Sequence, residues 1–333
     1  MHRQNLSHLF AGTLCAAALA LPSFGRTAAD DTDLVKVDAG VPAYTKVAGV
    51  SGNLNSIGSD TLNNCMALWT EGFRSQYPAV RIQVEGKGSS TAPPALIAGT
   101  AQLGPMSRAM KATELDDFQG KFGYKPTEIK VAIDALAVYV HKDNPVEKLT
   151  LAQVDALFGK QRKQGAARDA LTWADVGVTG DWGAVPVSLY GRNSASGTYG
   201  FFKEHVLKNG DYKDTVKEQP GSASVVLGVT EDRGGIGYSG IGYRTSGVRA
   251  VPVAKDEKSD PGSVGPASVY AGKYPLTRFL YVYVNKAPGK PLDPLVREFL
   301  TYVLSQPGQQ GALKDGYYPL PAKIANEELA KIK

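Results

Sequence analysis

The sequence predicts an α/β protein in which parallel strands are covered by helices on both faces. Strand-like and helix-like segments alternate from about residue 50 onward, which is the order expected of this class. Residues 131–140, VAIDALAVYV, are almost all apolar, as in a strand that is buried on both faces. The length of 333 residues permits two domains of ordinary size.

Each predicted element follows from its hydrophobic periodicity. Residues 80–84, VRIQV, alternate apolar with polar side chains, which predicts a strand. The further predicted strands are residues 131–140, 185–190, 235–243 and 279–285. The predicted helices are residues 62–76, 111–122, 199–209, 222–230 and 291–305. Residues 255–275 are rich in Gly, Pro, Ser and charged residues, which predicts a surface loop or a crossover.

The first 25 residues have the pattern of a cleavable secretory signal peptide. An arginine lies in a short polar start, residues 9–21 are apolar, and small residues follow. Cleavage fits after Ala20 or after Gly25, and the second site is preferred because it leaves the polar start RTAADD. A membrane anchor is the alternative, but the apolar run is short for a span. We therefore expect export to the periplasm, with residues 26–49 as a loosely held leader.

The composition argues against several classes of function. The formal net charge of +5 is small for this length, whereas nucleic-acid binding normally needs a concentrated basic patch. Cys15 would leave with the signal peptide, so the remaining Cys65 cannot form an internal disulfide. His141 and His205 lie far apart and HExxH is absent, so we expect no metal site and no cofactor.

The segment GRNSASGTYGFFKEHVL, residues 191–207, predicts a site for an oxyanion. Ser196 and Thr198 are good N-cap residues, and Gly197 allows close approach to the backbone. Apolar residues follow at helical spacing, which indicates that a helix begins here. Free backbone N–H groups, hydroxyls, the positive end of a helix dipole and the Arg192 guanidinium all favour a bound oxyanion.

Four segments share one design, in which a strand runs into Gly, Ser or Thr just before a helix. They are IGSDTLNN (57–64), EGKGSSTAPPAL (85–96), GPMSRAMK (104–111) and GRNSASGTYG (191–200). Any one of them could be an ordinary helix cap, because Ser and Thr cap helices in many proteins. In open α/β sheets, however, ligands bind where the carboxyl ends of strands and helix N-termini converge. Four such segments, two of them with an arginine, favour a shared site.

These four segments, in this order, resemble the phosphate-contact loops of the periplasmic phosphate-binding proteins of ABC importers, which are type II periplasmic binding proteins. The strongest match is RNSASGT, which fits the pattern Arg-x-x-x-Ser-Gly-Thr of that family. GSDT, GKGSS and the Ser-Arg of GPMSRAM fit the other loops. VAIDALAVYVHKDNP and GGIGYSGIGY resemble strands of the family, and the likeness spans about residues 50–310.

The resemblance implies two lobes joined by two hinge crossovers, each lobe a mostly parallel sheet flanked by helices. Lobe one would comprise residues 50–138 plus 276–333, and lobe two residues 139–275. Such a protein is no enzyme: it captures inorganic phosphate by closing its lobes and delivers it to an inner-membrane ABC permease. The phosphate-binding residues implied by the resemblance are Ser59, Thr61, Ser89, Ser90, Arg192, Ser196, Gly197 and Thr198, and the third loop adds Ser107 and Arg108, whose positive charge should strengthen anion binding.

The third loop departs from the family pattern. Some relatives have Ser-Asp there, and the aspartate accepts the proton of hydrogen phosphate, whereas this chain has Ser107-Arg108. An acceptor matters because sulfate has no proton to donate, so a buried carboxylate discriminates against it. Asp134 is the first candidate for a replacement and Asp60 the second. A structural hydrogen bond is the alternative role for Asp134, and a solvated surface position is the alternative for Arg108.

Two other functions remain open at this point. A secreted phosphatase would need a nucleophile beside a base, or a metal. A secreted protein for adhesion or sensing could use the same fold without transport. We expect instead a monomeric binding protein that neither makes nor breaks a bond.

Overall fold

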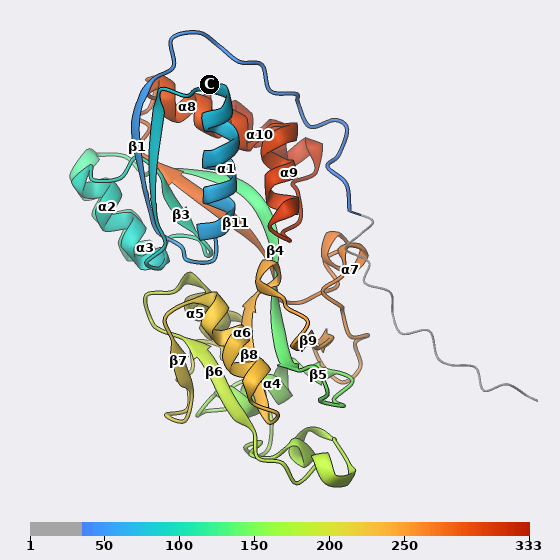
Figure 1. Ribbon diagram of the computed structural model, residues 1–333. Coiled ribbons are helices and arrows are strands. Elements are labelled where there is room, and N and C mark those ends of the chain that lie inside the picture. The colour runs from blue at the N-terminus through green and yellow to red at the C-terminus, as the bar shows by residue number, and fades with distance from the viewer. Residues whose placement is uncertain (1–34) are drawn as a thin grey trace, which may run out of the picture.

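The computed structural model of the protein describes residues 35–333. The predicted signal peptide and the first part of the predicted leader, residues 26–34, lie outside these residues. Figure 1 shows two lobes, one above the other, and strand β4 (Thr127–His141) runs from the upper lobe into the lower one. Within residues 35–333, every helix is too short or too polar to span a bilayer.

The upper lobe of Figure 1 combines segments from both ends of the described chain. Its strands are β1 (Gly52–Ile57), β2 (Val80–Glu85), β3 (Gly104–Met106) and β11 (Thr277–Val284). Its helices are α1 (Asn63–Gln76), the 3-10 helix η2 (Ser89–Thr91), α2 (Ala92–Ala98), α3 (Ala112–Phe122), α8 (Pro294–Val303), α9 (Gln306–Lys314) and α10 (Ala322–Ile332).

The lower lobe is built from the middle of the chain. Its strands are β5 (Leu149–Thr150), β6 (Ser188–Arg192), β7 (Lys217–Gln219), β8 (Gly235–Gly240), β9 (Val248–Ala250) and β10 (Val253–Ala254). Its helices are α4 (Leu151–Phe158), η3 (Trp173–Val176), η4 (Gly180–Trp182), α5 (Gly197–His205), α6 (Ser222–Glu231) and η5 (Ile241–Tyr243). Helix α7 (Pro266–Tyr270) lies beside the junction of the lobes in Figure 1.

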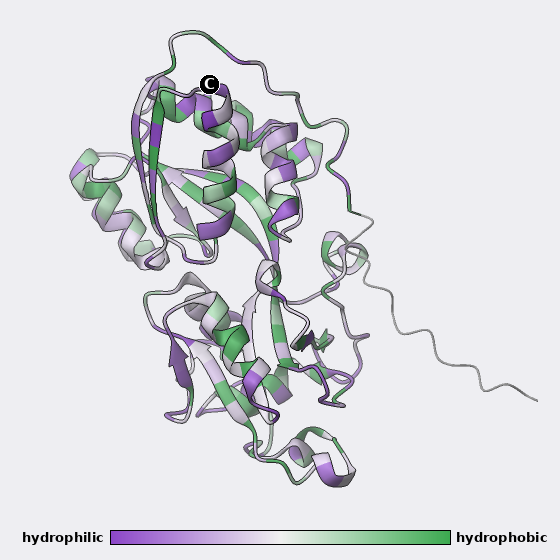
Figure 2. Ribbon diagram, in the orientation of Figure 1, coloured by the Kyte–Doolittle hydropathy of each residue, from purple (hydrophilic) through white to green (hydrophobic). Residues whose placement is uncertain are grey.

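One sheet extends through both lobes. Its strand order is β3-β11-β4-β8-β6-β7, and β9 also pairs with β4. The first part of β4 pairs with β11 and the second part with β8 and β9. Figure 2 shows hydrophobic residues along β4 and α6 and hydrophilic residues on the edge strand β7. The strand β4 is thus the structural link between the lobes.

The predicted α/β fold is confirmed, but the neighbours of β4 run antiparallel to it instead of parallel. Parallel pairs occur between β1 and β2, between β5 and β10, and between β6 and its neighbours β7 and β8. The apolar run at residues 131–140 is fully buried, as predicted, because α6, α9 and α10 pack on β4. A run of apolar residues predicts that both faces of the strand are buried. It does not predict whether the neighbouring strands are parallel or antiparallel.

Two predicted elements end differently in the structure. The predicted strand at residues 235–243 stops at Gly240 and continues as the short helix η5, because the N–H group of Ile241 donates to Oδ1 of Asp134 at 2.9 Å. The predicted loop at residues 255–275 contains α7. The first difference arises from a contact between residues that are distant in the sequence.

The predicted leader is held more firmly than its polar composition suggests. Of residues 26–49, the described part from residue 35 onward lies along the upper lobe (Figure 1). Gln306 Nε2 donates to the carbonyl oxygen of Asp38 at 2.7 Å, and the hydroxyls of Tyr44 and Tyr77 lie 2.7 Å apart. Polar contacts of this kind are not visible in an apolar pattern.

Asp315 follows α9 at the junction of the two lobes. A Cβ atom on Gly242 of the lower lobe would lie 2.4 Å from the Asp315 carbonyl oxygen, so the lobes touch here. Oδ2 of Asp315 is buried and has no hydrogen-bond partner among residues 35–333. Burial raises the pKa of the Asp315 carboxyl to about 7, although the backbone N–H of Cys65 opposes the shift. The folded protein therefore favours the neutral carboxyl.

We predict that the free energy of unfolding of the wild-type protein falls as the pH rises toward and through 7, and that Asp315→Asn abolishes this part of the fall. The folded pKa lies above the usual value of 3.8, so the stability that comes from the neutral carboxyl is complete below about pH 4 and lost above about pH 7. Urea denaturation at pH 4 and pH 8, in phosphate-free buffer, measures the change. Asp116→Asn, at an exposed position of α3, is the matched control. Equal pH dependence in wild type and Asp315→Asn would contradict the assignment.

Candidate anion-binding site

The predicted loops meet between the lobes, where α5 begins. The first three loops follow β1, β2 and β3 of the upper lobe, and the fourth follows β6 of the lower lobe. A Cβ atom on Gly197 would lie 2.2 Å from Ser89 Oγ and 2.6 Å from Ser107 Oγ. Any residue other than glycine would collide here, so Gly197 allows the start of α5 to approach two loops of the other lobe.

Most of the predicted site residues are withdrawn from solvent. Those that are at most 2% exposed are Ser59, Thr61, Ser89, Ser107, Asp134, Arg192, Ser196 and Thr198. A buried polar group is costly unless it is hydrogen-bonded. Ser59 Oγ and Arg192 Nε nevertheless have no partner in the part of the chain that the structure describes. Both atoms are donors, so the site can accommodate further acceptors.

Hydroxyl groups connect the loops to one another, and one pair of hydroxyls spans the cleft. Thr61 Oγ1 of the upper lobe lies 2.9 Å from Thr198 Oγ1 of the lower lobe. Ser89 Oγ accepts from the backbone N–H of Ser107 at 3.0 Å and lies 3.3 Å from Ser107 Oγ. A hydroxyl can rotate to donate or accept, so this set can adjust to an anion that offers only acceptors.

The remaining serines of the second and fourth loops have other partners. Ser196 Oγ caps α5, because it accepts from the backbone N–H groups of Thr198 and Tyr199 at 3.1 and 3.4 Å. The backbone N–H of Ser90 donates to the carbonyl of Ala195 at 3.1 Å, which ties the two lobes together. The cap interpretation of the sequence therefore holds for Ser196, whose helix presents its N-terminus to the cleft.

Arg192, buried at the end of β6, forms an ion pair with Asp60, whose side chain is 22% exposed. Its Nη1 lies 3.1 Å from Asp60 Oδ2 and donates to Ser222 Oγ at 2.7 Å. Asp60 Oδ2 also accepts from the N–H and hydroxyl of Ser222, each at 2.8 Å. Burial lowers the pKa of the Arg192 guanidinium, but an arginine remains charged at neutral pH. Asp60 thus holds the guanidinium in place and leaves Nε available.

Arg108 lies at the edge of the cluster and is not a solvated surface residue, because it is only 7% exposed. Its Nη2 and Nη1 donate to the two carboxylate oxygens of Glu114 at 2.6 and 2.7 Å, and Nη2 lies 3.3 Å from Ser90 Oγ. A Cβ atom on Gly200 would lie 3.1 Å from Arg108 Cδ, so the side chain packs against α5. Glu114 therefore neutralises the positive charge of Arg108, which the sequence analysis had placed among the anion-binding residues.

Asp134 makes the structural contacts that were its alternative role. Oδ1 accepts from the N–H of Ile241 at 2.9 Å, and Oδ2 accepts from Nε and Nη2 of Arg278 at 2.9 and 2.7 Å. Oδ1 of Asp60, in contrast, accepts no hydrogen bond from residues 35–333. Of the two carboxylates, Asp60 therefore has the freer oxygen.

The sequence interpretation missed Arg278 and Ser222. Arg278 is 5% exposed and donates to the Ser107 carbonyl at 2.8 Å and to Thr198 Oγ1 at 2.9 Å. The only available signal was a single cation before the apolar run FLYVYV, and the predicted strand began one residue after it. Ser222 opens α6, and its signal was the ordinary one of a serine at a helix start.

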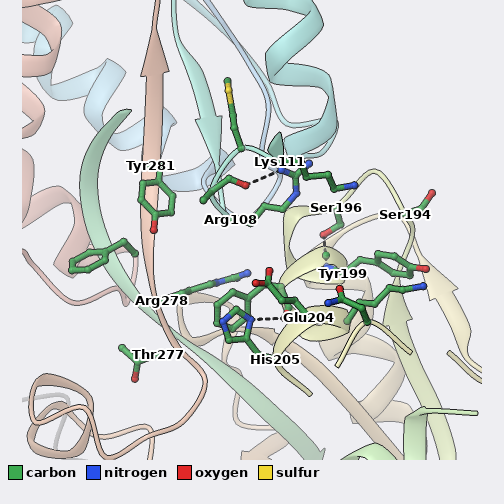
Figure 3. A pocket seen from close by; sticks show the side chains of 17 residues that line it. Arg108, Lys111, Ser194, Ser196, Tyr199, Glu204, His205, Thr277, Arg278 and Tyr281 are labelled. Carbon is green, nitrogen blue, oxygen red and sulfur yellow. Dashed lines mark hydrogen bonds between the residues drawn. The ribbon is translucent and has the colours of Figure 1, made fainter. Parts of the chain in front are cut away.

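A cavity of about 850 Å³ adjoins the cluster and is lined by both lobes. Figure 3 shows Arg108 and Lys111 from the third loop, Ser196, Tyr199 and His205 from the segment around α5, and Arg278 and Tyr281 from β11. Its lining includes four side chains with permanent positive charge, of Arg108, Lys111, Lys203 and Arg278, and a single carboxylate, of Glu204. Three of these cations are paired with carboxylates, Arg108 with Glu114, Lys203 with Asp211 and Arg278 with Asp134, so the wall of the cavity is closer to neutral than its lining residues suggest.

The hydrogen-bond donors of the cluster fit the binding of a tetrahedral oxyanion better than the binding of a metal ion or catalysis. Among residues 35–333 no group of three His, Cys, Asp or Glu side chains could hold a metal ion. His205 Nδ1 lies 3.0 Å from the carbonyl of Phe201, and His141 lies beside Asp143. Neither imidazole contacts a hydroxyl of the cluster, so the described residues contain no serine activated by a histidine.

Comparisons with known proteins agree with this geometry. Residues 43–307 match a model described as a PBP superfamily domain. The phosphate-binding protein PstS of Pseudomonas aeruginosa is 55% identical over 316 residues, which cover 95% of this chain and 97% of that protein.

Solved structures show the same fold at lower identity. A candidate phosphate ABC transporter substrate-binding protein of Clostridium perfringens, solved with bound phosphate, is 24% identical with a TM-score of 0.67, covering 81% of this chain and 100% of that one. An ABC-type phosphate transport receptor of Vibrio cholerae is 21% identical with a TM-score of 0.62, covering 80% and 100%. The chain belongs to the PBP superfamily and, within it, to the family of the phosphate-binding protein PstS.

Proposed function

We propose that this protein binds inorganic phosphate between its lobes as the substrate-binding component of a phosphate ABC transporter. The observation that carries the proposal is a pair of buried donors, Ser59 Oγ and Arg192 Nε, that have no partner among residues 35–333 and lie in a cluster built by loops of both lobes. The 55% identity to the PstS protein of P. aeruginosa supports the choice of ligand. Inorganic phosphate offers several acceptor oxygens to such donors.

The affinity would come mainly from dehydrated hydrogen bonds and less from net charge. Arg192 is paired with Asp60 and Arg278 with Asp134, so the two arginines and two carboxylates sum to zero. Hydroxyls, backbone N–H groups and the start of α5 would supply the remaining attraction. The proposed ligand set is Ser59, Asp60, Thr61, Ser89, Ser90, Ser107, Arg108, Asp134, Arg192, Ser196, Gly197 and Thr198.

We assign the acceptor of the phosphate proton to Asp60, with Asp134 as the alternative. Asp134 already accepts three hydrogen bonds, from Ile241 and Arg278. Asp60 has an oxygen that accepts none from the described chain. A carboxylate next to the anion would accept the proton of hydrogen phosphate and would repel sulfate, which has no proton to share.

The ligand would be enclosed by movement of the two lobes. We place lobe one at residues 50–138 plus 276–333 and lobe two at residues 139–275, as the resemblance implies. The signal-peptide pattern supports export to the periplasm, where the closed monomer would deliver phosphate to an inner-membrane ABC permease. Closure requires that phosphate contact both lobes, since a ligand shifts an equilibrium only by its differential affinity.

Titration calorimetry of purified, phosphate-stripped protein tests the proposal directly. We expect saturable binding of phosphate and no detectable binding of sulfate at the same concentrations. Absence of heat and of any thermal shift at millimolar phosphate would contradict it and favour a role in adhesion or sensing. Sustained hydrolysis of a phosphate ester by metal-free protein would instead indicate a phosphatase.

We predict that Arg192→Ala weakens phosphate binding by at least about 2 kcal/mol, or roughly thirtyfold, because a buried charged donor is lost. Calorimetry measures the affinity, and thermal unfolding without ligand reports the accompanying loss of stability. Arg249→Ala is the matched control, because Arg249 is half-buried in the lower lobe and donates to the carbonyls of Asn144 and Val146, outside the cluster. Equal affinities in wild type and Arg192→Ala would exclude this arginine from the site.

The two carboxylates can be separated by their effect on sulfate. We predict that Asp60→Asn raises sulfate affinity by about tenfold or more while phosphate affinity changes less, because the amide can donate to an unprotonated oxyanion. Both substitutions leave an arginine without its carboxylate, Arg192 or Arg278, and should lower stability, but Asp134→Asn should do so without admitting sulfate. Sulfate and phosphate titrations of both variants give the answer. If only Asp134→Asn admits sulfate, the assignment to Asp60 is wrong.

A further inference from the structure

We propose that Arg278 is a positioning residue for the anion: it fixes Thr198 as a hydrogen-bond donor and ties that donor to the hinge strands. The inference rests on the proposed function and deepens it. Nothing in the Arg-x-x-x-Ser-Gly-Thr pattern points to this arginine, which lies 80 residues beyond Thr198 in the sequence.

Arg278 lies near the start of β11, where that strand pairs with β4, the strand that links the lobes. It is on β11, and its partner in the strand register is Asp134 on β4. Nε and Nη2 donate to Asp134 Oδ2 at 2.9 and 2.7 Å, and both side chains are almost completely buried. A buried guanidinium needs such a partner, so Asp134 explains why the arginine can remain charged there.

The rest of the guanidinium reaches both lobes. Nη1 donates to the carbonyl of Ser107 in the third loop at 2.8 Å, and Nη2 donates to Thr198 Oγ1 in α5 at 2.9 Å. The ring of Phe201, one turn further along α5, lies 5.3 Å from the guanidinium carbon. Figure 3 shows Arg278 extending from β11 toward α5. These contacts join an upper-lobe strand to α5 of the lower lobe, so they would break if the two lobes moved apart.

The contact with Thr198 has a direction. A guanidinium has no acceptor atom, so Thr198 Oγ1 must accept from Arg278. The single hydroxyl proton of Thr198 is then free for another acceptor, which is Thr61 Oγ1 at 2.9 Å or an anion oxygen. A charged donor on the far side also polarises the hydroxyl and makes it a better donor. Arg278 thus prepares Thr198 for a ligand whose oxygens accept.

A double-mutant cycle with Arg278→Lys and Thr198→Val tests the inference. Lysine keeps a positive charge for Asp134 but lacks the planar fork that reaches Asp134, Ser107 and Thr198 together. We expect Arg278→Lys to weaken phosphate binding about tenfold in the presence of Thr198 and by less than about twofold in the Thr198→Val background, a coupling in the usual range for residues in contact. Calorimetry up to millimolar phosphate gives the four dissociation constants.

The controls separate this inference from loss of stability and from failure of the proposed function. Arg249→Lys, outside the cluster, should leave phosphate binding unchanged in both backgrounds. If Arg278→Lys does not fold, the neutral pair Arg278→Gln with Asp134→Asn replaces it in the same cycle. Equal weakening by the Arg278 variant with and without Thr198 would overturn the inference. Absence of phosphate binding in the wild-type protein would overturn the proposed function itself.

Discussion

The burial of charged and polar groups between the lobes is the constraint on which the rest of the structure depends. Two arginines lie in that interior, and each has its own carboxylate: Asp60 for Arg192 and Asp134 for Arg278. Without these partners the guanidinium groups would cost too much free energy to bury. With them the interior is close to neutral, so it can be closed and dehydrated while some donor atoms remain available.

The position of these pairs follows from the shared sheet. Because β4 continues from one lobe into the other and pairs with β11 on one side and β8 on the other, Asp134 lies at the point where the lobes join. Helix α5, which begins at Gly197, lies in the lower lobe of Figure 1, and Gly197 contacts Ser89 and Ser107 of the upper lobe. The contacts between α5 and the upper loops therefore lie next to the strand that joins the lobes, which is where a hinge would act on them.

The sequence predicted the features that depend on neighbouring residues. The strand-to-helix loops and the Arg-x-x-x-Ser-Gly-Thr pattern indicated the fold and the segments that meet at Gly197. Arg278 escaped because its partner Asp134 is 144 residues away and no local pattern marks the pair. The sequence likewise could not show that Arg108 pairs with Glu114 instead of facing an anion, because the same loop sequence permits both side-chain orientations. The antiparallel direction of the strands beside β4 could not be predicted either, because the apolar sequence of β4 indicates only that the strand is buried.

The central claim is that one tetrahedral anion is held by donors of both lobes inside the cleft. The most direct test is a crystal structure of the protein with bound phosphate. The account predicts a single ion within hydrogen-bond distance of Arg192 Nε and Ser59 Oγ, the two buried donors that lack partners among residues 35–333. An ion held instead in the outer cavity by Lys111 and Tyr281, with those two donors still unpaired, would contradict it.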